Sequence, residues 1–523
     1  MGELLVGVDV GTGSARAGVF SPGGALLGRA ELPIDMRRRS PREAEHDSEQ
    51  IWRAVGGAVR GALAAADARG SDVVGIGFDA TCSLVLRGRD GEPLPVTPDG
   101  DARWDTMVWL DHRAMAEAEE CTATGDAVLN SLGGVMSPEM QVPKLMWLKR
   151  RLPGSWEKMG AAVDLVDFLT FRATGSTARS QSSLACKWLW NGDGQGGWPG
   201  AFLRQVGLGD LVERAGLPPA PVPPGSDLGP LAPAAAEALG LTTATRVAAG
   251  AIDAHAGLLG VLGAGAAAPV KTLCLIAGTS NSVLALAPDP RPGKGIWGPY
   301  GGAVLPGLWL LEAGQSATGA LLDHVVRFHA AGGEPTAERH KAVATRIARL
   351  RAAEGESFAS DLHVLPDFHG NRSPLAEPAA LGVISGLALE TDFDSLCRLY
   401  WRTALAVALG TRQNLEALAQ LGFPTDRLLL GGGHTRNPVL LELYADVTGA
   451  TLVVPNAPDA MLLGSAMLAG TAAGRHDSLV EAVAALDQGG VERHPSVPRS
   501  HYDRDYRILL EMQRQRRVLA TMT

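Results

Sequence analysis

The chain opens with apolar runs separated by glycine-rich turns. Residues 4–10, 15–20 and 25–34 are each long enough for one strand, and Gly and Pro residues separate them. This pattern predicts three antiparallel strands joined by tight turns. A Walker A loop and a dinucleotide-binding loop both lead directly into a helix, so neither fits this opening.

The next segment alternates between helical and strand-like patterns. Residues 51–69 are alanine-rich with helical spacing, and residues 73–78 form an apolar run of strand length. The polar stretch that contains Thr81 follows this run. Because open α/β sheets bind ligands at the carboxyl ends of their strands, we expect a ligand near Thr81.

The strand–turn–strand pattern recurs in the second half of the chain. Residues 272–286 again place a Gly-Thr turn between two apolar runs, and a proline-rich stretch at 217–233 precedes this copy. Two copies of one hairpin indicate an internal duplication. We therefore predict an α/β protein of two duplicated domains, residues 1–258 and 259–523, with a cleft between them.

Composition narrows the class of ligand. The net charge of -9 gives no global support for binding nucleic acid or an anionic membrane, so a small molecule is the expected partner. Five cysteines without a CxxC pair favour a reducing compartment, and we expect the cytoplasm. The apolar stretch 248–270 is interrupted by Asp253 and His255, which predicts a buried helix and no membrane span. The sequence does not decide the oligomeric state, and a homodimer is one of the options.

Both Gly-Thr turns carry groups suited to anions. Backbone N–H groups of a glycine-rich turn form a concave anion site, and nearby hydroxyls add donors. The residues concerned are Gly11, Thr12, Gly13 and Ser14 in the first copy and Gly278, Thr279 and Ser280 in the second. One turn from each domain can hold a triphosphate from opposite sides. Each turn alone is weak evidence for phosphate binding, since such hairpins are common in proteins.

Three charged residues are further candidates for phosphate chemistry. Asp9 ends the first strand, where it either binds Mg²⁺ or caps the turn. Arg16, on the return strand, is either a phosphate partner or a surface charge. Asp253 stands among small apolar residues and either accepts a proton from a substrate hydroxyl or caps a helix.

Seven motifs in order give the chain a clear resemblance. They are GVDVGTGSAR at 7–16, VWLDHRA at 108–114, PKLMWL at 143–148, GAIDAHAG at 250–257, AGTSN at 277–281, EAGQSATG at 312–319 and GGGHTRNP at 431–438. With them the chain resembles the FGGY family of carbohydrate kinases along essentially its whole length. The resemblance implies the duplicated actin-like (ribonuclease-H-like) ATPase fold, ATP as phosphoryl donor and Mg²⁺.

The resemblance also implies roles for individual residues. Asp253 would be the catalytic base, with Asp9 and Asp253 near Mg²⁺. The groups at the β- and γ-phosphates would be Thr12, Gly13, Arg16, Gly278 and Thr279. Gly314 would approach the ribose, and Gly432, Gly433 and Asn437 would flank the adenine. Only glycine lets the backbone lie flat against a base, and Asn437 is expected to start the next helix.

For the sugar, the chain resembles the pentulokinase branch, especially ribulose and ribitol kinases. The polar groups then expected around the substrate are Thr81, Asp111, Arg113, Lys187, Asp253 and Glu312. Lys187 and Arg113 also fit ordinary ion pairs. The patterns of xylulose and glycerol kinases are absent after residue 78, which favours D-ribulose and leaves L-ribulose, ribitol and other polyols open. An actin-like conformational ATPase and a sugar sensor are the alternatives of another class.

Overall fold

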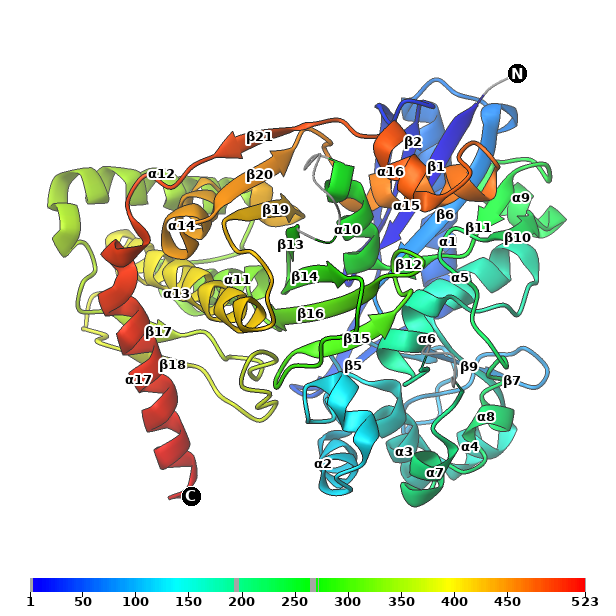
Figure 1. The fold of residues 1–523 in the computed structure, drawn as a ribbon, viewed down its shortest axis with the longest axis horizontal. Coiled ribbons are helices and arrows are strands. Elements are labelled where there is room, and N and C mark those ends of the chain that lie inside the picture. The colour runs from blue at the N-terminus through cyan, green and yellow to red at the C-terminus, as the bar shows by residue number, and fades with distance from the viewer. Residues whose placement is uncertain (1–2, 192–196, 264–269, 271, 523) are drawn as a thin grey trace.

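The computed structural model describes residues 3–191, 197–263, 270 and 272–522. Its described residues form two seven-stranded sheets, a five-stranded sheet and a two-stranded sheet, with helices on their faces (Figure 1). The N-terminal end lies beside the first large sheet, and the C-terminal helix lies at the opposite end of the molecule.

The first large sheet contains the predicted three-strand meander. Its strands run in the order β10-β11-β6-β1-β2-β3, and β12 also pairs with β6. Their bounds are β1 Leu4–Val10, β2 Ser14–Phe20, β3 Leu26–Pro33, β6 Val73–Ala80, β10 Asp227–Pro230, β11 Arg246–Ala248 and β12 Ala251–Ile252. β1, β2 and β3 pair antiparallel, while β6 lies parallel to β1.

The second large sheet repeats this topology. Its order is β15-β16-β14-β13-β19-β20-β21, with β13, β14 and β16 antiparallel and β19 parallel to β13. Their bounds are β13 Leu273–Ala277, β14 Asn281–Ala287, β15 Trp297–Gly301, β16 Trp309–Gln315, β19 Arg427–Gly431, β20 Thr451–Pro455 and β21 Gly490–Arg493. The duplicated α/β architecture expected from the sequence is therefore confirmed.

Two helices pack between the two large sheets and hold the two copies of the duplicated fold together. α10 (Asp253–Leu262) packs against β13 and β19 of the second sheet, and α15 (Ala460–Ala472) packs against β1 and β6 of the first. The helices also pack on each other so closely that a Cβ at Gly464 would lie 1.9 Å from the Ala256 carbonyl oxygen. Only glycine allows this approach. The predicted domain boundary at 258 falls inside α10.

Helices cover both sheets. On the first half they are α1 Ser48–Ala65, α2 Met115–Ala123, α3 Gln141–Arg151, α4 Pro153–Lys158, α5 Leu165–Thr174, α6 Gln181–Lys187, α7 Gly200–Gln205, α8 Leu211–Arg214 and α9 Pro233–Leu239. On the second half they are α11 Gly319–Phe328, α12 Ala337–Glu354, α13 Phe393–Gln420, α14 Pro438–Thr448 and α17 Asp503–Ala520. α16 Leu479–Ala485 packs on α15 beside the first large sheet. α17 packs its apolar side on α13 and β17.

Smaller sheets extend each half. The five-stranded sheet has the order β4-β5-β8-β7-β9, and β17 pairs with β18 in the second half. Their bounds are β4 Arg37–Ser40, β5 Glu43–His46, β7 Leu84–Gly88, β8 Thr106–Met107, β9 Met159–Asp164, β17 His363–Leu365 and β18 Val383–Ser385.

The stretch predicted as one buried helix at 248–270 is shorter in the structure. Its first residues continue strand pairing through β12, and the helix proper is α10, whose side chains are largely buried. Residues 264–269 lie outside the described part of the chain. Within the described residues, no helix combines the length and apolar character needed to cross a membrane.

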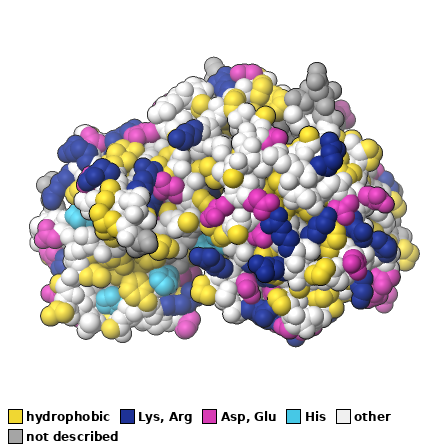
Figure 2. Space-filling view, turned by 90° about the horizontal axis from the view of Figure 1, so that it is seen from below, with side chains coloured by type: hydrophobic (Ala, Val, Ile, Leu, Met, Phe, Trp, Pro, Cys, Tyr) yellow, Lys and Arg dark blue, Asp and Glu magenta, His cyan; other side chains and the backbone are white. Residues whose placement is uncertain are grey.

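The surface in Figure 2 mixes the two signs of charge. Lys and Arg side chains alternate with Asp and Glu over this face, and no part of it is covered by one sign alone. Mixed charge of this kind gives the face no extended field for a polyanion.

Candidate active site

A cavity of about 1300 Å³ lies between the two large sheets. Both copies of the duplicated hairpin contribute to its wall, as does the start of α10. The predicted site residues that line it are Asp9, Gly11, Thr12, Gly13, Ser14, Arg16, Thr81, Lys187, Asp253, Gly278, Thr279, Glu312, Gly432, Gly433 and Asn437. Residues from positions 9 to 437 are thus brought to one cleft.

The two Gly-Thr turns face this cavity with free space in front of them. Each turn closes on itself, through Gly11 N–H to the Ser14 carbonyl at 3.0 Å and Gly278 N–H to the Ser280 carbonyl at 2.8 Å. A Cβ at Gly13 or Gly278 would meet nothing within 4 Å. The turns therefore leave room for a group as large as a phosphate.

Asp9 is fully buried beside Arg16. Arg16 Nη2 lies 2.5 Å from Asp9 Oδ2, and the β1–β6 register sets Asp79 directly beside Asp9. Burial raises the pKa of Asp9 to about 7, with Arg16 opposing the shift and the charges of Asp459 and Asp253 adding to it. Burial also raises the pKa of Asp79, whose Oδ2 accepts a hydrogen bond from Ser465 at 2.7 Å.

This cluster fits a magnesium ion that is shared with phosphates. Arg16 compensates Oδ2 of Asp9, whereas Oδ1 of Asp9 and Oδ1 of Asp79 have no hydrogen-bond partner among the described residues. Buried oxygens without donors are costly, and a hard cation satisfies them. Among the described residues no group of three or more His, Cys, Asp or Glu side chains forms a closed metal site. An open site of one or two carboxylates completed by phosphate and water is what Mg²⁺ commonly uses.

Asp253 is the first residue of α10 and lines the cavity. Its Oδ1 accepts a hydrogen bond from the N–H of Ala254 at 2.8 Å, which fixes the carboxylate at the helix start. Burial raises the pKa of Asp253, while the Ala254 N–H and the charge of Arg16 oppose the shift. A carboxylate that is fixed, half-buried and of raised pKa suits proton abstraction near neutral pH.

One end of the cavity gathers charged and aromatic groups. Lys187 is buried at the end of α6, with Nζ 4.5 Å from the centre of the Trp297 ring. Glu312, on β16, accepts a hydrogen bond from the hydroxyl of Ser282 at 2.7 Å. Thr81 lies nearby in the same wall, directly after β6. Hydroxyl-rich ligands fit such a mixture of donors and acceptors.

The other end is formed by the segment after β19. Gly432 has a φ of 90°, and a Cβ there would lie 2.4 Å from the Ala277 carbonyl oxygen. Asn437 caps α14 by accepting the N–H of Val439 at 3.0 Å, as its position before a helix predicted. Its Nδ2 donates to Tyr400 Oη at 3.0 Å, so its amide is held from two sides.

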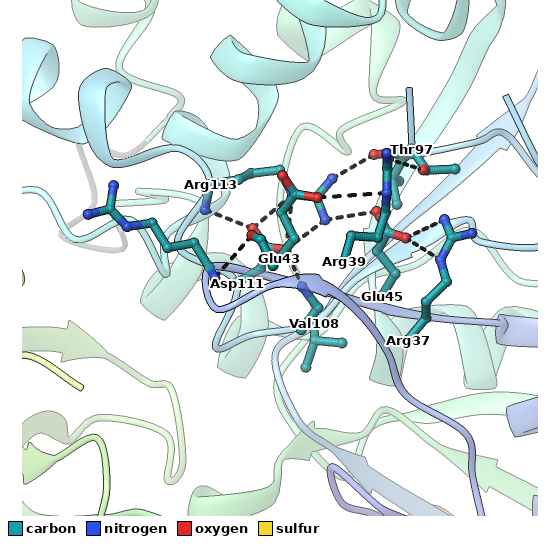
Figure 3. A network of polar contacts seen from close by, with 12 residues as sticks. Arg37, Arg39, Glu43, Glu45, Thr97, Val108, Asp111 and Arg113 are labelled. Atoms are coloured by element: carbon teal, nitrogen blue, oxygen red, sulfur yellow. Dashed lines mark hydrogen bonds and ion pairs between the residues drawn. The ribbon is translucent and has the colours of Figure 1, made fainter. Parts of the chain in front are cut away.

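The structure places Asp111 and Arg113 away from the cavity wall. Figure 3 shows them in a buried network, where Arg113 pairs with Asp111 at 2.7 Å and with Glu45 at 2.9 Å. Asp111 Oδ2 also accepts the N–H of Ala44. Ion pairs and hydrogen bonds within the protein therefore occupy the polar atoms of Asp111 and Arg113, which the family resemblance places around the sugar.

Gly314 also lies apart from the cavity lining. It is paired with Ser282 inside the second large sheet, and a Cβ there would lie 2.3 Å from the Asn281 carbonyl oxygen. The close packing of the neighbouring strand is therefore enough to require glycine at position 314.

Several cavity residues were missed by sequence reasoning. Trp109 belongs to the VWLDHRA motif, and its Nε1 donates to Thr12 Oγ1 at 3.0 Å. Arg372 reaches the cavity from the loop between β17 and β18. Asp459, just before α15, lies 4.0 Å from Arg16 Nη1. The tryptophan was open to prediction from its motif, whereas the other two depend on long-range packing.

Family comparison agrees with the arrangement of the two halves. Residues 4–260 match the N-terminal domain of the FGGY family of carbohydrate kinases, and residues 273–473 match its C-terminal domain. The chain therefore belongs to the FGGY family of carbohydrate kinases.

Individual relatives cover nearly the whole chain. An FGGY carbohydrate kinase domain-containing protein from Homo sapiens is 41% identical over 99% of this chain and 98% of its own length. A D-ribulokinase from Saccharomyces cerevisiae is 35% identical over 90% of this chain and 72% of its own length. The crystal structure of a xylulose kinase from Rhodospirillum rubrum has a TM-score of 0.75 at 23% identity, covering 98% of this chain and 99% of that one, and shares the fold.

Proposed function

We propose that this protein transfers the γ-phosphoryl group of ATP to a terminal hydroxyl of a pentulose, with D-ribulose as the favoured substrate. One observation carries the proposal: a single cavity contains two phosphate-sized turns, the carboxylate of Asp253 and a sugar-sized group of polar side chains that includes Lys187 and Glu312. The family supplies carbohydrate kinase chemistry, and the yeast relative named as a D-ribulokinase supports the sugar.

Asp253 acts as the general base in this proposal. Its carboxylate accepts the proton of the attacking hydroxyl as the new O–P bond forms and the bond from the γ-phosphorus to the bridging oxygen breaks, which leaves ADP. The raised pKa of Asp253 strengthens it as a proton acceptor, and closure of the two halves around the sugar would keep water from competing with it.

The two turns and Arg16 bind the triphosphate. Backbone N–H groups and the hydroxyls of Thr12 and Thr279 donate to phosphate oxygens, and Arg16 adds a positive charge. Asp9 and Asp253 are the carboxylates that would hold Mg²⁺, which supplies charge neutralisation on the phosphates when bound. The backbone at Gly432 and Gly433 and the side chain of Asn437 would flank the adenine.

L-ribulose, ribitol and other polyols are the alternative acceptors. They offer the same hydroxyl chemistry to Lys187, Glu312 and Thr81. We further propose a cytoplasmic location, because all five cysteines are free and buried and form no disulfide that an oxidising compartment would favour.

The test is ADP release from MgATP with a panel of D-ribulose, L-ribulose, D-xylulose, ribitol, arabitol, erythritol and glycerol. We expect D-ribulose to stimulate turnover most and Asp253→Asn to lower kcat by about 10²- to 10⁴-fold. Asp392→Asn is a matched control, since Asp392 also lies at the start of a helix, α13, outside the cavity. Sugar-independent ATP turnover that survives Asp253→Asn would identify a conformational ATPase and refute the kinase proposal.

A further inference from the structure

Arg372 is a buried cation that reaches the sugar end of the cavity from the second half of the chain. It lies in the loop between β17 and β18, its side chain is 7% exposed, and it belongs to the cavity wall. Burial of a guanidinium is expensive unless carboxylates and hydrogen bonds compensate for it. Its partners therefore indicate what it does.

Two glutamates hold the guanidinium. Arg372 Nη2 donates to Glu139 Oε2 at 3.0 Å, and Nη1 lies at the longer distance of 3.5 Å from Glu312 Oε1. Glu312 is one of the groups expected to bind the sugar and also lines the cavity. The short contact fixes the guanidinium, whereas the long one leaves Nη1 with capacity for a further acceptor.

Aromatic rings define the plane on which the guanidinium lies. Its central carbon is 4.9 Å from the Trp297 ring centre and 5.8 Å from that of Trp109. Arg372 Nε is buried without a hydrogen-bond partner in the described residues. The hydrogen-bonding capacity left for a ligand is therefore that of Nη1, which lies beside Glu312 in the cavity wall.

The Glu139 contact crosses between the two halves of the molecule. Glu139 precedes α3 in the first half, and next to this ion pair His112 of the first half stacks on His369 of the second with ring centres 4.2 Å apart. Burial alone would raise the pKa of Glu139, but Arg372 and His112 hold that pKa below its usual range. Glu139 is therefore charged at neutral pH and can orient Arg372 from across the cleft.

We propose that Arg372 is a sugar-positioning residue, which donates to a substrate oxygen beside Glu312 while Glu139 fixes its guanidinium from the opposite half. This inference rests on the proposed sugar kinase function. Because a guanidinium only donates, its partner on the sugar is a carbonyl oxygen or a hydroxyl acting as acceptor. Positioning at this end of the cavity affects the sugar, while the groups that bind ATP lie elsewhere in the cavity wall.

The experiment compares steady-state KM values for sugar and for ATP in the wild type, Arg372→Met and Arg372→Lys. The sugar is the member of the polyol panel with the highest wild-type kcat/KM. We expect Arg372→Met to raise the sugar KM about tenfold or more and to leave the ATP KM within about twofold. Arg372→Lys retains the charge without the planar fork, so it should raise the sugar KM less, and it serves if Arg372→Met does not fold.

Two further variants complete the design. Glu139→Gln should raise the sugar KM in the same direction by a smaller factor, because it frees the guanidinium to turn. Arg398→Met is the matched control: Arg398 also pairs with a glutamate, Glu354, but outside the cavity, so both KM values should stay unchanged.

The outcomes separate the inference from the proposed function. A sugar KM that is unchanged in folded Arg372→Met and Arg372→Lys would overturn the positioning role while leaving the kinase intact. Equal increases in the sugar and ATP KM values would also overturn it, because they indicate a general structural defect. A wild-type protein that phosphorylates no sugar of the panel would overturn the proposed function and this inference together.

Discussion

Arg16 Nη2 lies 2.5 Å from Asp9 Oδ2 at the wall of the cavity that both Gly-Thr turns line. The pair neutralises a buried carboxylate in the ligand-free protein. A triphosphate would compete with Asp9 for Arg16. A magnesium ion would then balance the negative charge of the Asp9 carboxylate in place of Arg16. Nucleotide binding should therefore change the protonation of Asp9.

The stability of the ligand-free protein should depend on Asp9 between about pH 4 and pH 7. Burial raises the pKa of Asp9 to about 7 in the fold, whereas the unfolded chain releases this proton near pH 4. The folded protein then binds more protons in this range, so the stabilisation is present at low pH and is lost as pH rises through about 7. Its loss is at most about 1.4 kcal/mol per pH unit.

Thermal unfolding of wild type and Asp9→Asn across this range measures the effect. The stability of the wild type relative to Asp9→Asn should fall from about pH 4 to pH 7 and level off above pH 7, and saturating MgATP should flatten the difference. Asp392→Asn should run parallel to the wild type throughout. Parallel curves for Asp9→Asn in the absence of nucleotide would show that Asp9 is not the titrating group.

The hydrogen bond between Trp109 and Thr12 connects the sugar end of the cavity with the first phosphate turn. Trp109 Nε1 donates to Thr12 Oγ1 at 3.0 Å. Trp109→Phe keeps an aromatic ring but removes this donor and part of the indole ring, whose centre lies 5.8 Å from the guanidinium carbon of Arg372, so we expect kcat/KM to fall about three- to tenfold without loss of the fold.

The control for this variant is Trp156→Phe. Trp156 donates to Asp210 at 3.3 Å in the first half and lies outside the cavity wall, so its replacement should leave kcat/KM unchanged. Full activity in Trp109→Phe, measured with both substrates saturating and subsaturating, would contradict a catalytic contribution of the hydrogen bond.

Arg113 should matter for stability rather than for sugar binding. Its side chain is 2% exposed and is held by Asp111 and Glu45 in the network of Figure 3. Arg113→Met leaves the buried carboxylate of Asp111 without its cation, while Glu45 keeps its ion pair with Arg37, and the loss should lower the free energy of unfolding by about 3–5 kcal/mol.

Urea unfolding and the sugar KM of the remaining folded enzyme test this expectation. We expect reduced stability with an unchanged KM. An increase in the sugar KM at full stability would restore the role that the family resemblance suggested for Arg113.

The local pattern of the chain predicted the parts of the site that one segment can build. The turn at Gly11, the strand that carries Asp9 near its end and the helix that begins at Asp253 follow from short runs of apolar, glycine and polar residues. The repeated hairpin predicted the second sheet for the same reason. Each of these features is decided within a few residues, where hydrophobic periodicity and turn chemistry agree.

The parts that the sequence did not place depend on packing between distant segments. WLDHRA contains both Trp109, which reaches the cavity, and Asp111, which turns into the network with Arg113, and a motif alone does not tell these directions apart. Arg372 meets Glu139 across 233 positions of sequence. Such a contact follows from the arrangement of the two halves, which a single sequence does not encode in any local pattern.

A chain of hydrogen bonds at the end of the cavity opposite Lys187 supports Asn437. Nδ2 of Asn437 donates to Tyr400 Oη at 3.0 Å, Tyr400 Oη lies 2.9 Å from His340 Nδ1, and His340 Nε2 lies 3.0 Å from Asp323 Oδ1. If His340 donates its Nε2 proton to Asp323, its Nδ1 accepts the proton of Tyr400. This series of hydrogen bonds then fixes the orientation of the Asn437 amide toward the nucleotide.

Tyr400→Phe removes the central hydroxyl of this chain and leaves the cap that Asn437 provides for α14. We expect the KM for ATP to rise about three- to tenfold while the sugar KM stays unchanged, because the lost hydrogen bond lies at the nucleotide end. Tyr506→Phe is the matched control, since its hydroxyl donates to Glu416 outside the cavity. A sugar KM that rises with the ATP KM would show that these hydrogen bonds stabilise the second half in general. A selective rise of the ATP KM would show that they serve nucleotide binding.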